Sequence, residues 1–284
     1  MVKARMWIEA SGNTPNPRAR LSRRVAALAI LGSLVAAGAG AAGAADPQAQ
    51  QILAPTGKLR VGLYPGTPTS ILPDAPDGPR GVGYDLGGEF ARRLGVPFEP
   101  VVFSKNAEVL EAVKTGKVDM AFTNASVARA KEMDFGPPFL EIELGYLVPK
   151  RAKITVLNAV DTTGIRVGVT KGSSSDGVLS RDLNFASVVR TDTVGIAVEM
   201  MAAGQLDAFA TNKATLFEMA EKLPGSQVLD GRWGIERHAI AIPKGRDQGR
   251  AFVEKFTEDA KAEGLVKAAI ARAGLRGATA SEQK

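Results

Sequence analysis

The chain has 284 residues, of which 36 are Lys or Arg and 30 are Asp or Glu, giving a formal net charge of +6 at pH 7. It contains no cysteine and one histidine, which excludes a disulfide scaffold and a Cys/His metal cluster. Six of the basic residues and one acidic residue lie within the first 45 positions, so the rest carries 30 basic and 29 acidic residues. We therefore expect no nucleic-acid partner.

The first 45 residues have the pattern of an export signal. Four arginines between Arg18 and Arg24 precede the apolar run "VAALAILGSLVAAGAGAAGA", which ends in small residues suited to cleavage. We expect a signal peptide over 1–45, removed near Ala44 or Ala45, and a periplasmic protein. General secretion is favoured over twin-arginine export. A retained membrane anchor is the alternative, because the run approaches the length of a spanning helix. A lipid anchor is not expected, since no cysteine is present.

Two internal repeats dominate the remaining sequence. "KLRVGLYPG" at 58–66 is echoed by "GIRVGVTKG" at 164–172, and "EVLEAVKTGKVDMAFTN" at 108–124 by "IAVEMMAAGQLDAFATN" at 196–212. The longer pair predicts a helix, a glycine stop, an aspartate and an apolar strand ending in Thr-Asn. Gly116 and Gly204 stand where each helix needs a left-handed residue. The chain thus contains one strand–helix–strand pattern twice.

The segments around these repeats complete an α/β pattern. "GYDLGGEFARRLGV" predicts a helix and "FEPVVF" a strand. "ELGYLVPK" and "HAIAIPKG" predict strands that leave each half, followed by helices up to about residue 275. We expect an α/β fold of two lobes with mainly parallel sheets and two hinge crossovers. The expected ranges are lobe 1 at 57–148 with 245–275, lobe 2 at 149–244, and a flexible tail at 276–284.

Asn124 and Asn212 end equivalent strands of the two repeats. Ligands of open parallel sheets bind beyond the carboxyl ends of the strands, so both asparagines are expected to face a cleft between the lobes. Thr123 and Thr211 would accompany them. The alternative is that each asparagine caps the helix that follows it.

Several motifs together resemble one protein family. "LRVG", "GYDLGGEFARRLGV", "LEAVKTGKVDMAF", "RAKEMDFGPPF", "IRVGVTKGSSS" and "GQLDAFATN" follow the order and spacing of extracellular solute-binding proteins of family 3 over about 57–275. The resemblance implies the type II periplasmic binding fold and capture of a polar solute, typically an amino acid, for an ABC importer. It also implies a membrane permease as partner. We expect a monomer without cofactor, metal or catalytic residues.

Arg129 falls on the position that grips a ligand carboxylate in this family. A guanidinium suits that task because it donates two parallel hydrogen bonds to one carboxylate. The alternative is a surface arginine paired with Glu132 or Asp134. The resemblance also places Ser173 and Ser174 against the carboxylate. Their segment, "KGSSSDG", opens a predicted helix whose backbone N–H groups attract anions.

Departures from the family pattern lead to a prediction of the ligand. The resemblance implies an aspartate for the ligand ammonium where this chain has Asn212, and aromatic residues where it has Thr67 and Asn106. The segment before Arg129 is also shorter, which alters the floor around Asn124 and Ser126. We therefore predict a small polar anion without a free ammonium, bound by Arg129, Asn106, Asn124 and Asn212. The alternative is an ordinary amino acid whose ammonium meets Asp85 or Glu141.

Two other function classes stay open. The fold has dehydratase relatives, and a periplasmic enzyme of that kind would need a pocket acid. Glu141 is the acid that the sequence offers, although a hinge or surface position suits it better. His238 lies in an alternating strand and is expected in the core or the hinge. A sensor module is the third class. We expect a binding protein and not an enzyme.

Overall fold

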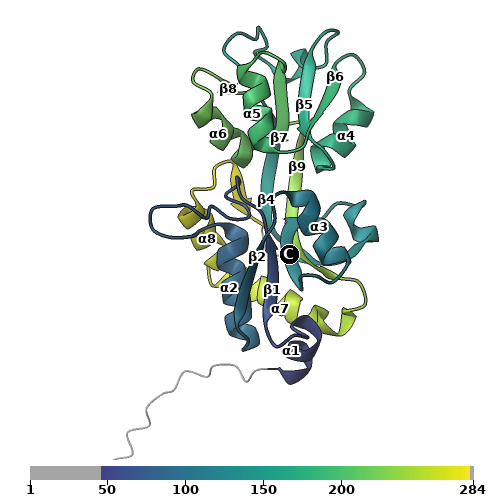
Figure 1. The fold of residues 1–284 in the computed structure, drawn as a ribbon, viewed down its shortest axis with the longest axis vertical. Coiled ribbons are helices and arrows are strands. Elements are labelled where there is room, and N and C mark those ends of the chain that lie inside the picture. The colour runs from purple at the N-terminus through teal and green to yellow at the C-terminus, as the bar shows by residue number, and fades with distance from the viewer. Residues whose placement is uncertain (1–45, 282–284) are drawn as a thin grey trace, which may run out of the picture. The chain divides into compact units, whose positions relative to one another are not determined.

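The protein is described by a computed structural model over residues 46–281 (Figure 1). The predicted signal peptide lies outside the described residues, as do positions 282–284. The described residues belong to one compact unit.

Ten strands form one hydrogen-bonded sheet within these residues, in the order β2-β1-β3-β9-β4-β7-β5-β6, with β10 and β8 also paired to β4. Their bounds are β1 Leu59–Leu63, β2 Phe98–Val102, β3 Met120–Asn124, β4 Met133–Val148, β5 Arg166–Thr170, β6 Ser187–Thr191, β7 Ala208–Asn212, β8 Gln227–Val228, β9 Gly234–Pro243 and β10 Ala278–Ala280.

The helices lie between the strands in alternation, as expected for an α/β fold. They are α1 Pro47–Leu53, α2 Val82–Leu94, α3 Asn106–Lys114, α4 Ser174–Asp182, α5 Val194–Ala202, α6 Lys213–Lys222, α7 Arg250–Ala262 and α8 Leu265–Ala273, with short 3₁₀ helices η1 Arg129–Lys131, η2 Leu157–Ala159 and η3 Asp247–Gly249. Gly116 and Gly204 follow α3 and α5 with positive φ of 70° and 77°, as the sequence predicts.

Two long strands, β4 and β9, connect two groups of elements (Figure 1). We refer to the group of β1–β3 with α1–α3, α7 and α8 as lobe 1, and to the group of β5–β8 with α4–α6 as lobe 2 (Figure 1). Strands β1–β3 pair in parallel, and so do β5–β7, whereas β4 and β9 pair antiparallel with each other and with β7 and β3. The predicted fold class is confirmed. The two parallel sheets become one path because β9 pairs with β3, β4 pairs with β7, and β4 and β9 pair with each other.

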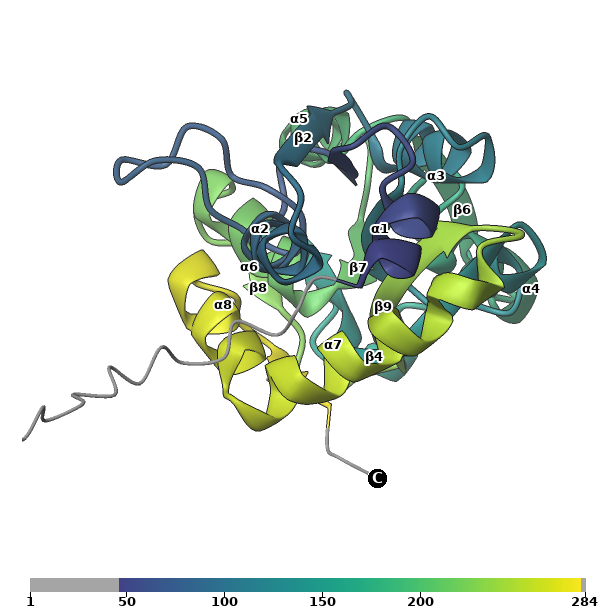
Figure 2. The same ribbon diagram turned by 90° about the horizontal axis from the view of Figure 1, so that it is seen from below.

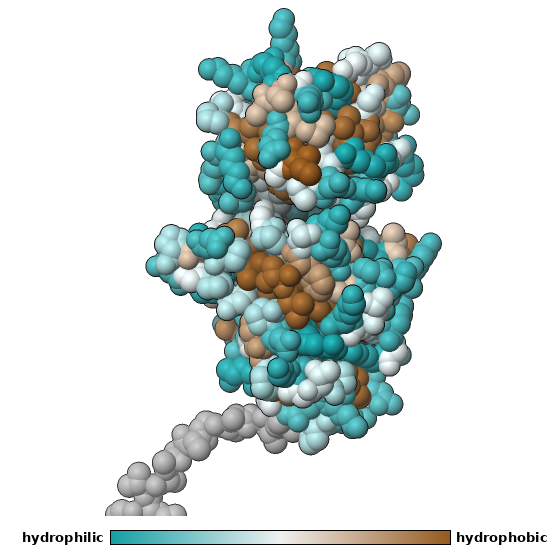
Figure 3. Space-filling view, viewed as in Figure 1, coloured by the Kyte–Doolittle hydropathy of each residue, from teal (hydrophilic) through white to brown (hydrophobic). Residues whose placement is uncertain are grey.

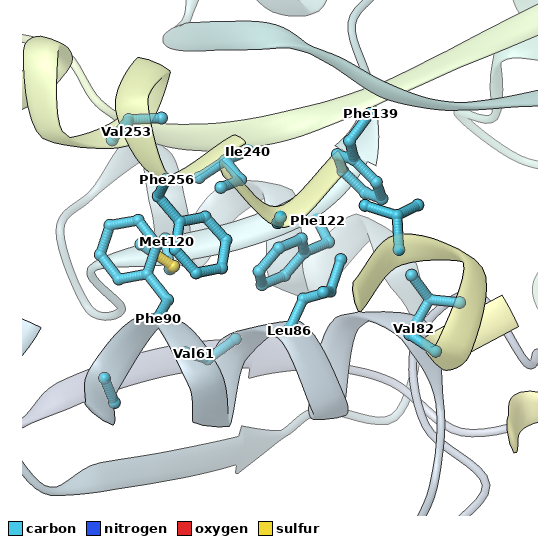
Figure 4. Close-up of a cluster of buried hydrophobic side chains, with 14 of the residues drawn as sticks. Val61, Val82, Leu86, Phe90, Met120, Phe122, Phe139, Ile240, Val253 and Phe256 are labelled. Carbon is cyan, nitrogen blue, oxygen red and sulfur yellow. The ribbon is translucent and has the colours of Figure 1, made fainter. Parts of the chain in front are cut away.

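The core of lobe 1 joins segments far apart in sequence. Phe90 of α2 packs edge-on against Phe252, with ring centroids 5.1 Å apart, and also contacts Phe256 of α7. Val61 of β1 and Ile240 of β9 belong to the same buried cluster (Figure 4). The last helices therefore return to lobe 1, where α8 lies beside α2 (Figure 2).

The internal repeat extends to a repeated ion pair. Arg60 at the start of β1 donates to both carboxylate oxygens of Asp119, at 2.9 and 2.8 Å. Arg166 at the start of β5 does the same to Asp207, at 2.8 and 2.9 Å. The aspartate of each repeat thus has a structural role. It stands just before β3 or β7 and connects that strand to β1 or β5 through the arginine.

The end of the described chain differs from the expected flexible tail. Ala278–Ala280 form β10, which pairs antiparallel with Leu140–Ile142 of β4. Backbone pairing of this kind satisfies the donors of a segment that has no apolar periodicity of its own. The predicted lobe ranges remain a prediction, although the pairing of Leu144–Leu147 with β7 shows that β4 enters lobe 2 before residue 149.

Apolar side chains gather mainly in four buried clusters. On the face in Figure 3, hydrophilic side chains surround separate apolar areas on both lobes. Between residues 46 and 281, none of the helices has the length and apolar character required to cross a bilayer.

Candidate ligand-binding site

A cavity of about 590 Å³ lies between the lobes. Lobe 1 lines it with the end of β3, the loop after β1 and the start of α3, and lobe 2 with the ends of β5 and β7 and the starts of α4 and α5. Glu236 and His238 of β9 also line the cavity. The carboxyl ends of the parallel strands therefore meet there, as topology predicts for this kind of sheet.

Arg129 lines the cavity from the short helix η1. Its Nη1 donates to Thr123 Oγ1 at 2.7 Å and to the Asn124 carbonyl oxygen at 3.2 Å. The two acids considered as surface partners are engaged elsewhere, Glu132 with Lys114 and Asp134 with Lys244. Among the described residues no carboxylate lies within ion-pair distance of Arg129, so its guanidinium keeps donors for a ligand.

Three titratable groups influence one another in this cavity. Burial lowers the pKa of Arg129 below its usual value, and Glu236 and Tyr64 oppose that shift. Burial raises the pKa of Tyr64 to about 12, and the charge of Glu236 adds to the effect. Burial also acts to raise the pKa of Glu236, but His238, Arg129 and Asn212 together hold it below the usual value. At neutral pH the cavity therefore contains an arginine cation and a glutamate anion.

Direct contacts between the lobes involve three of the predicted site residues. Asn124 Nδ2 donates to Ser174 Oγ across the cavity at 2.7 Å, and Asn124 Oδ1 accepts from the Arg237 backbone N–H. The Thr67 hydroxyl lies 3.3 Å from that of Thr215 in α6. Ser173 is the N-cap of α4 and accepts from the Asp176 N–H at 3.1 Å. Ser173 therefore caps α4, and Ser174, the next residue, also lines the cavity.

The remaining predicted residues divide into two groups. Asn212 lines the cavity and also caps α6, because its Oδ1 accepts from the Thr215 N–H at 3.0 Å. Asn106, the first residue of α3, lines the cavity too. Ser126 differs: it is not among the lining residues, and its Oγ accepts from the Arg129 N–H at 3.3 Å. Ser126 thus supports the turn that presents Arg129.

The sequence reasoning missed Glu236. The residue is 7% exposed, and its Oε2 accepts from Asn212 Nδ2 at 3.3 Å and lies 3.2 Å from His238 Nε2. The predicted strand began at His238, whereas β9 begins at Gly234. Extending the alternation by two residues would have placed Glu236 on the same buried face as His238.

The prediction of a ligand without an ammonium rested on the neutral Asn212, and it stays a prediction. Glu236 supplies the cavity with a carboxylate that this reasoning did not consider. The acids named as alternatives lie elsewhere, because Glu141 pairs with Arg237 and Asp85 with Arg272, and neither lines the cavity. No group of three or more His, Cys, Asp or Glu side chains suited to a metal ion occurs in residues 46–281.

Comparison with known proteins gives one family. The family model of bacterial extracellular solute-binding proteins, family 3, matches residues 59–273. The chain is 26% identical over 161 residues to the glutamine-binding protein of an ABC transporter of Bacillus subtilis, a match that covers 55% of this chain and 59% of that protein. It is 22% identical over 254 residues to the L-cystine-binding protein of Escherichia coli, covering 86% and 93%.

A solved structure agrees with the fold. The solute receptor for L-cysteine of Neisseria gonorrhoeae superposes with a TM-score of 0.70 at 25% sequence identity. The superposition covers 80% of this chain and 92% of the receptor.

Proposed function

The chain belongs to family 3 of the bacterial extracellular solute-binding proteins, and from this premise we propose that it captures a small polar solute for an ABC importer. The solute carries a carboxylate or a similar anionic group and is held between the two lobes. The proposed location is the periplasm, and the proposed partner is a membrane permease that receives the solute from a monomeric binding protein.

The main support for this proposal is that Arg129 lines the cavity and has no carboxylate partner among the described residues. A half-buried arginine in a cavity costs desolvation free energy that a carboxylate partner would offset. Within the described chain Arg129 donates to a hydroxyl and a carbonyl, both neutral. A ligand carboxylate would complete the site with charge-assisted hydrogen bonds, which are about twice as strong as neutral ones.

The second lobe offers further donors for the same anion. Ser174 is the first residue of α4, where free backbone N–H groups and the helix dipole favour negative charge. A carboxylate held by Arg129 in lobe 1 and by this helix start in lobe 2 would draw the lobes together. Its binding free energy would then shift the population toward a closed state.

An enzyme on the same fold is the alternative, but the acid nominated for it is in the wrong place. Glu141 is paired with Arg237 and does not line the cavity. Recovery of a bound solute unchanged after long incubation supports a carrier, and release of a dehydrated product supports an enzyme.

The test is a thermal-shift screen of the protein against amino acids, organic acids, amines and sulfonates. A solute at a hundredfold excess over its Kd adds about 2.7 kcal/mol of stability, or roughly 5–10 °C in Tm for a domain of this size. In Arg129→Ala we expect this ligand-induced shift to disappear while the ligand-free Tm stays near that of the wild type. Arg129→Lys should restore little, because an ammonium does not reproduce the bidentate geometry.

Arg181→Ala is the matched control, since Arg181 is an exposed arginine of α4 that pairs with Asp182. It should leave the ligand-induced shift unchanged. An equal ligand response in Arg129→Ala and the wild type would refute the proposed role of Arg129.

A further inference from the structure

Glu236 is a buried carboxylate that lines the cavity. It lies in β9 opposite Ile142 of β4, and the next strand beyond β4 ends at Asn212. Oε2 is engaged by Asn212 and His238. Oε1 accepts no hydrogen bond from residues 46–281, and it is not sealed from the cavity. One oxygen of a buried anion therefore still lacks a donor.

No permanent cation pairs with Glu236 among the described residues. Its one ion-pair contact is with His238, whose imidazole is charged only when protonated. Arg129 acts on Glu236 through its charge but makes no ion-pair contact with it. Buried carboxylates are stable when paired and fully hydrogen-bonded, so this carboxylate has capacity for another N–H donor.

The neighbouring residue Asn212 determines which oxygen of Glu236 is left without a donor, because it donates to Oε2. Asn212 is the last residue of β7 and carries a neutral amide. The amide donates to Glu236, which holds the negative charge on β9, on the other side of β4 from β7. A cationic subsite can thus exist without an acid on the second-lobe strand.

We propose that Glu236 of the hinge strand β9 is the cation anchor of the site, and that its Oε1 accepts a hydrogen bond from a ligand ammonium. Asn212 and His238 act as positioning residues that fix the carboxylate. Resting on the proposed function, this inference makes the ligand a zwitterion, with its carboxylate at Arg129 and its ammonium at Glu236. The anchor then lies on a strand that pairs with β3 of lobe 1 and with β4.

The experiment compares matched ligands on matched variants by calorimetry. The probes are the twenty standard amino acids and L-cystine. Each one that binds is paired with its des-amino acid, for example L-glutamine with 4-carbamoylbutanoate. Glu236→Gln keeps the shape of the side chain and an oxygen for Asn212 but removes the charge. We expect it to weaken amino-acid binding by about 100-fold, because one partner of a buried charge pair is lost.

The same substitution should leave the binding of the des-amino acid unchanged or stronger. Glu236→Asp keeps the charge on a shorter stem and should lose less affinity than Glu236→Gln. Glu141→Gln, on the adjacent strand but outside the cavity, should bind like the wild type. A ligand-free Tm within a few degrees of the wild type excludes misfolding as the cause.

The outcomes separate this inference from the proposed function. If Arg129→Ala abolishes binding while Glu236→Gln binds the amino acid as well as the wild type does, the anchor is refuted and the carboxylate site stands. If des-amino acids bind and none of the amino acids does, the inference that the ligand is a zwitterion is refuted, and the carboxylate site again stands.

Discussion

At the scale of single residues, Glu236 also makes stability depend on pH. Burial opposes its ionised form, but His238, Arg129 and Asn212 favour it and hold its pKa below the usual value of 4.5. A carboxyl whose pKa is lower in the folded state stabilises the fold above its unfolded pKa. That contribution is lost as the pH falls through the folded pKa.

We expect Glu236→Gln to remove this contribution. The difference in free energy of unfolding between wild type and variant should therefore be largest near pH 7 and should shrink below about pH 4.5. Urea unfolding at pH 7, 5, 4 and 3.5 measures it. Glu236→Asp should retain the pH dependence, and a difference that stays constant from pH 7 to 3.5 would contradict the prediction.

The residues that could be predicted from sequence are those fixed by local patterns. Arg129 stands in a motif, and Asn124 and Asn212 end repeated strands, so topology alone takes them to the cavity. Glu236 was missed because its position depends on long-range pairing: β9 continues past His238 only because β4 supplies hydrogen-bond partners for Gly234–Arg237. Local polarity argued against a strand there, and tertiary pairing outweighed it.

At the scale of elements, glycine stops and apolar spacing were sufficient to predict α2, α3 and α5 with the strands that follow them. β10 could not be predicted in this way. Its three residues, Ala278–Ala280, carry no alternation, and their structure comes from the backbone of β4. Arg276 adds an ion pair to Glu221 and lies over the Phe217 ring, 4.8 Å from its centroid. The segment therefore joins α8 of lobe 1 to the hinge strand and to α6 of lobe 2.

Removal of residues 276–284 should accordingly destabilise the protein. The backbone hydrogen bonds of β10 contribute about 0.5–1.5 kcal/mol each, and the half-exposed pair of Arg276 adds at most about 1 kcal/mol. We expect a loss of about 1–3 kcal/mol in the free energy of unfolding, measured by urea titration at constant m-value. Removal of 282–284 alone is the control and should cost little. Equal stability of the two truncated chains would show that β10 contributes nothing.

At the scale of the whole molecule, two direct side-chain contacts within residues 46–281 bridge the lobes beside the cavity. One joins Asn124 to Ser174, and the other joins Thr67 to Thr215. These contacts exist only while the lobes stay close together, whereas the pairing of β4 with β9 does not depend on closure. They therefore favour the closed population independently of the ligand.

Thr215 is the cleanest probe of this coupling, because it lines the cavity but has no proposed role as a ligand anchor. Thr215→Val keeps the shape of the side chain and removes the hydroxyl that meets Thr67. Loss of about 0.5–1.5 kcal/mol of closed-state stabilisation should shift the ligand-free protein toward open conformations and raise the Kd by roughly 2- to 10-fold. X-ray scattering should show a larger radius of gyration without ligand, and a radius near that of the wild type at saturation.

Thr257→Val is the control: Thr257 is an equally buried threonine of α7 whose hydroxyl donates to the Val253 carbonyl within its own helix. It should change stability without changing Kd or the ligand-free radius, and the same Kd change in both variants would exclude a role for the Thr67–Thr215 contact in closure.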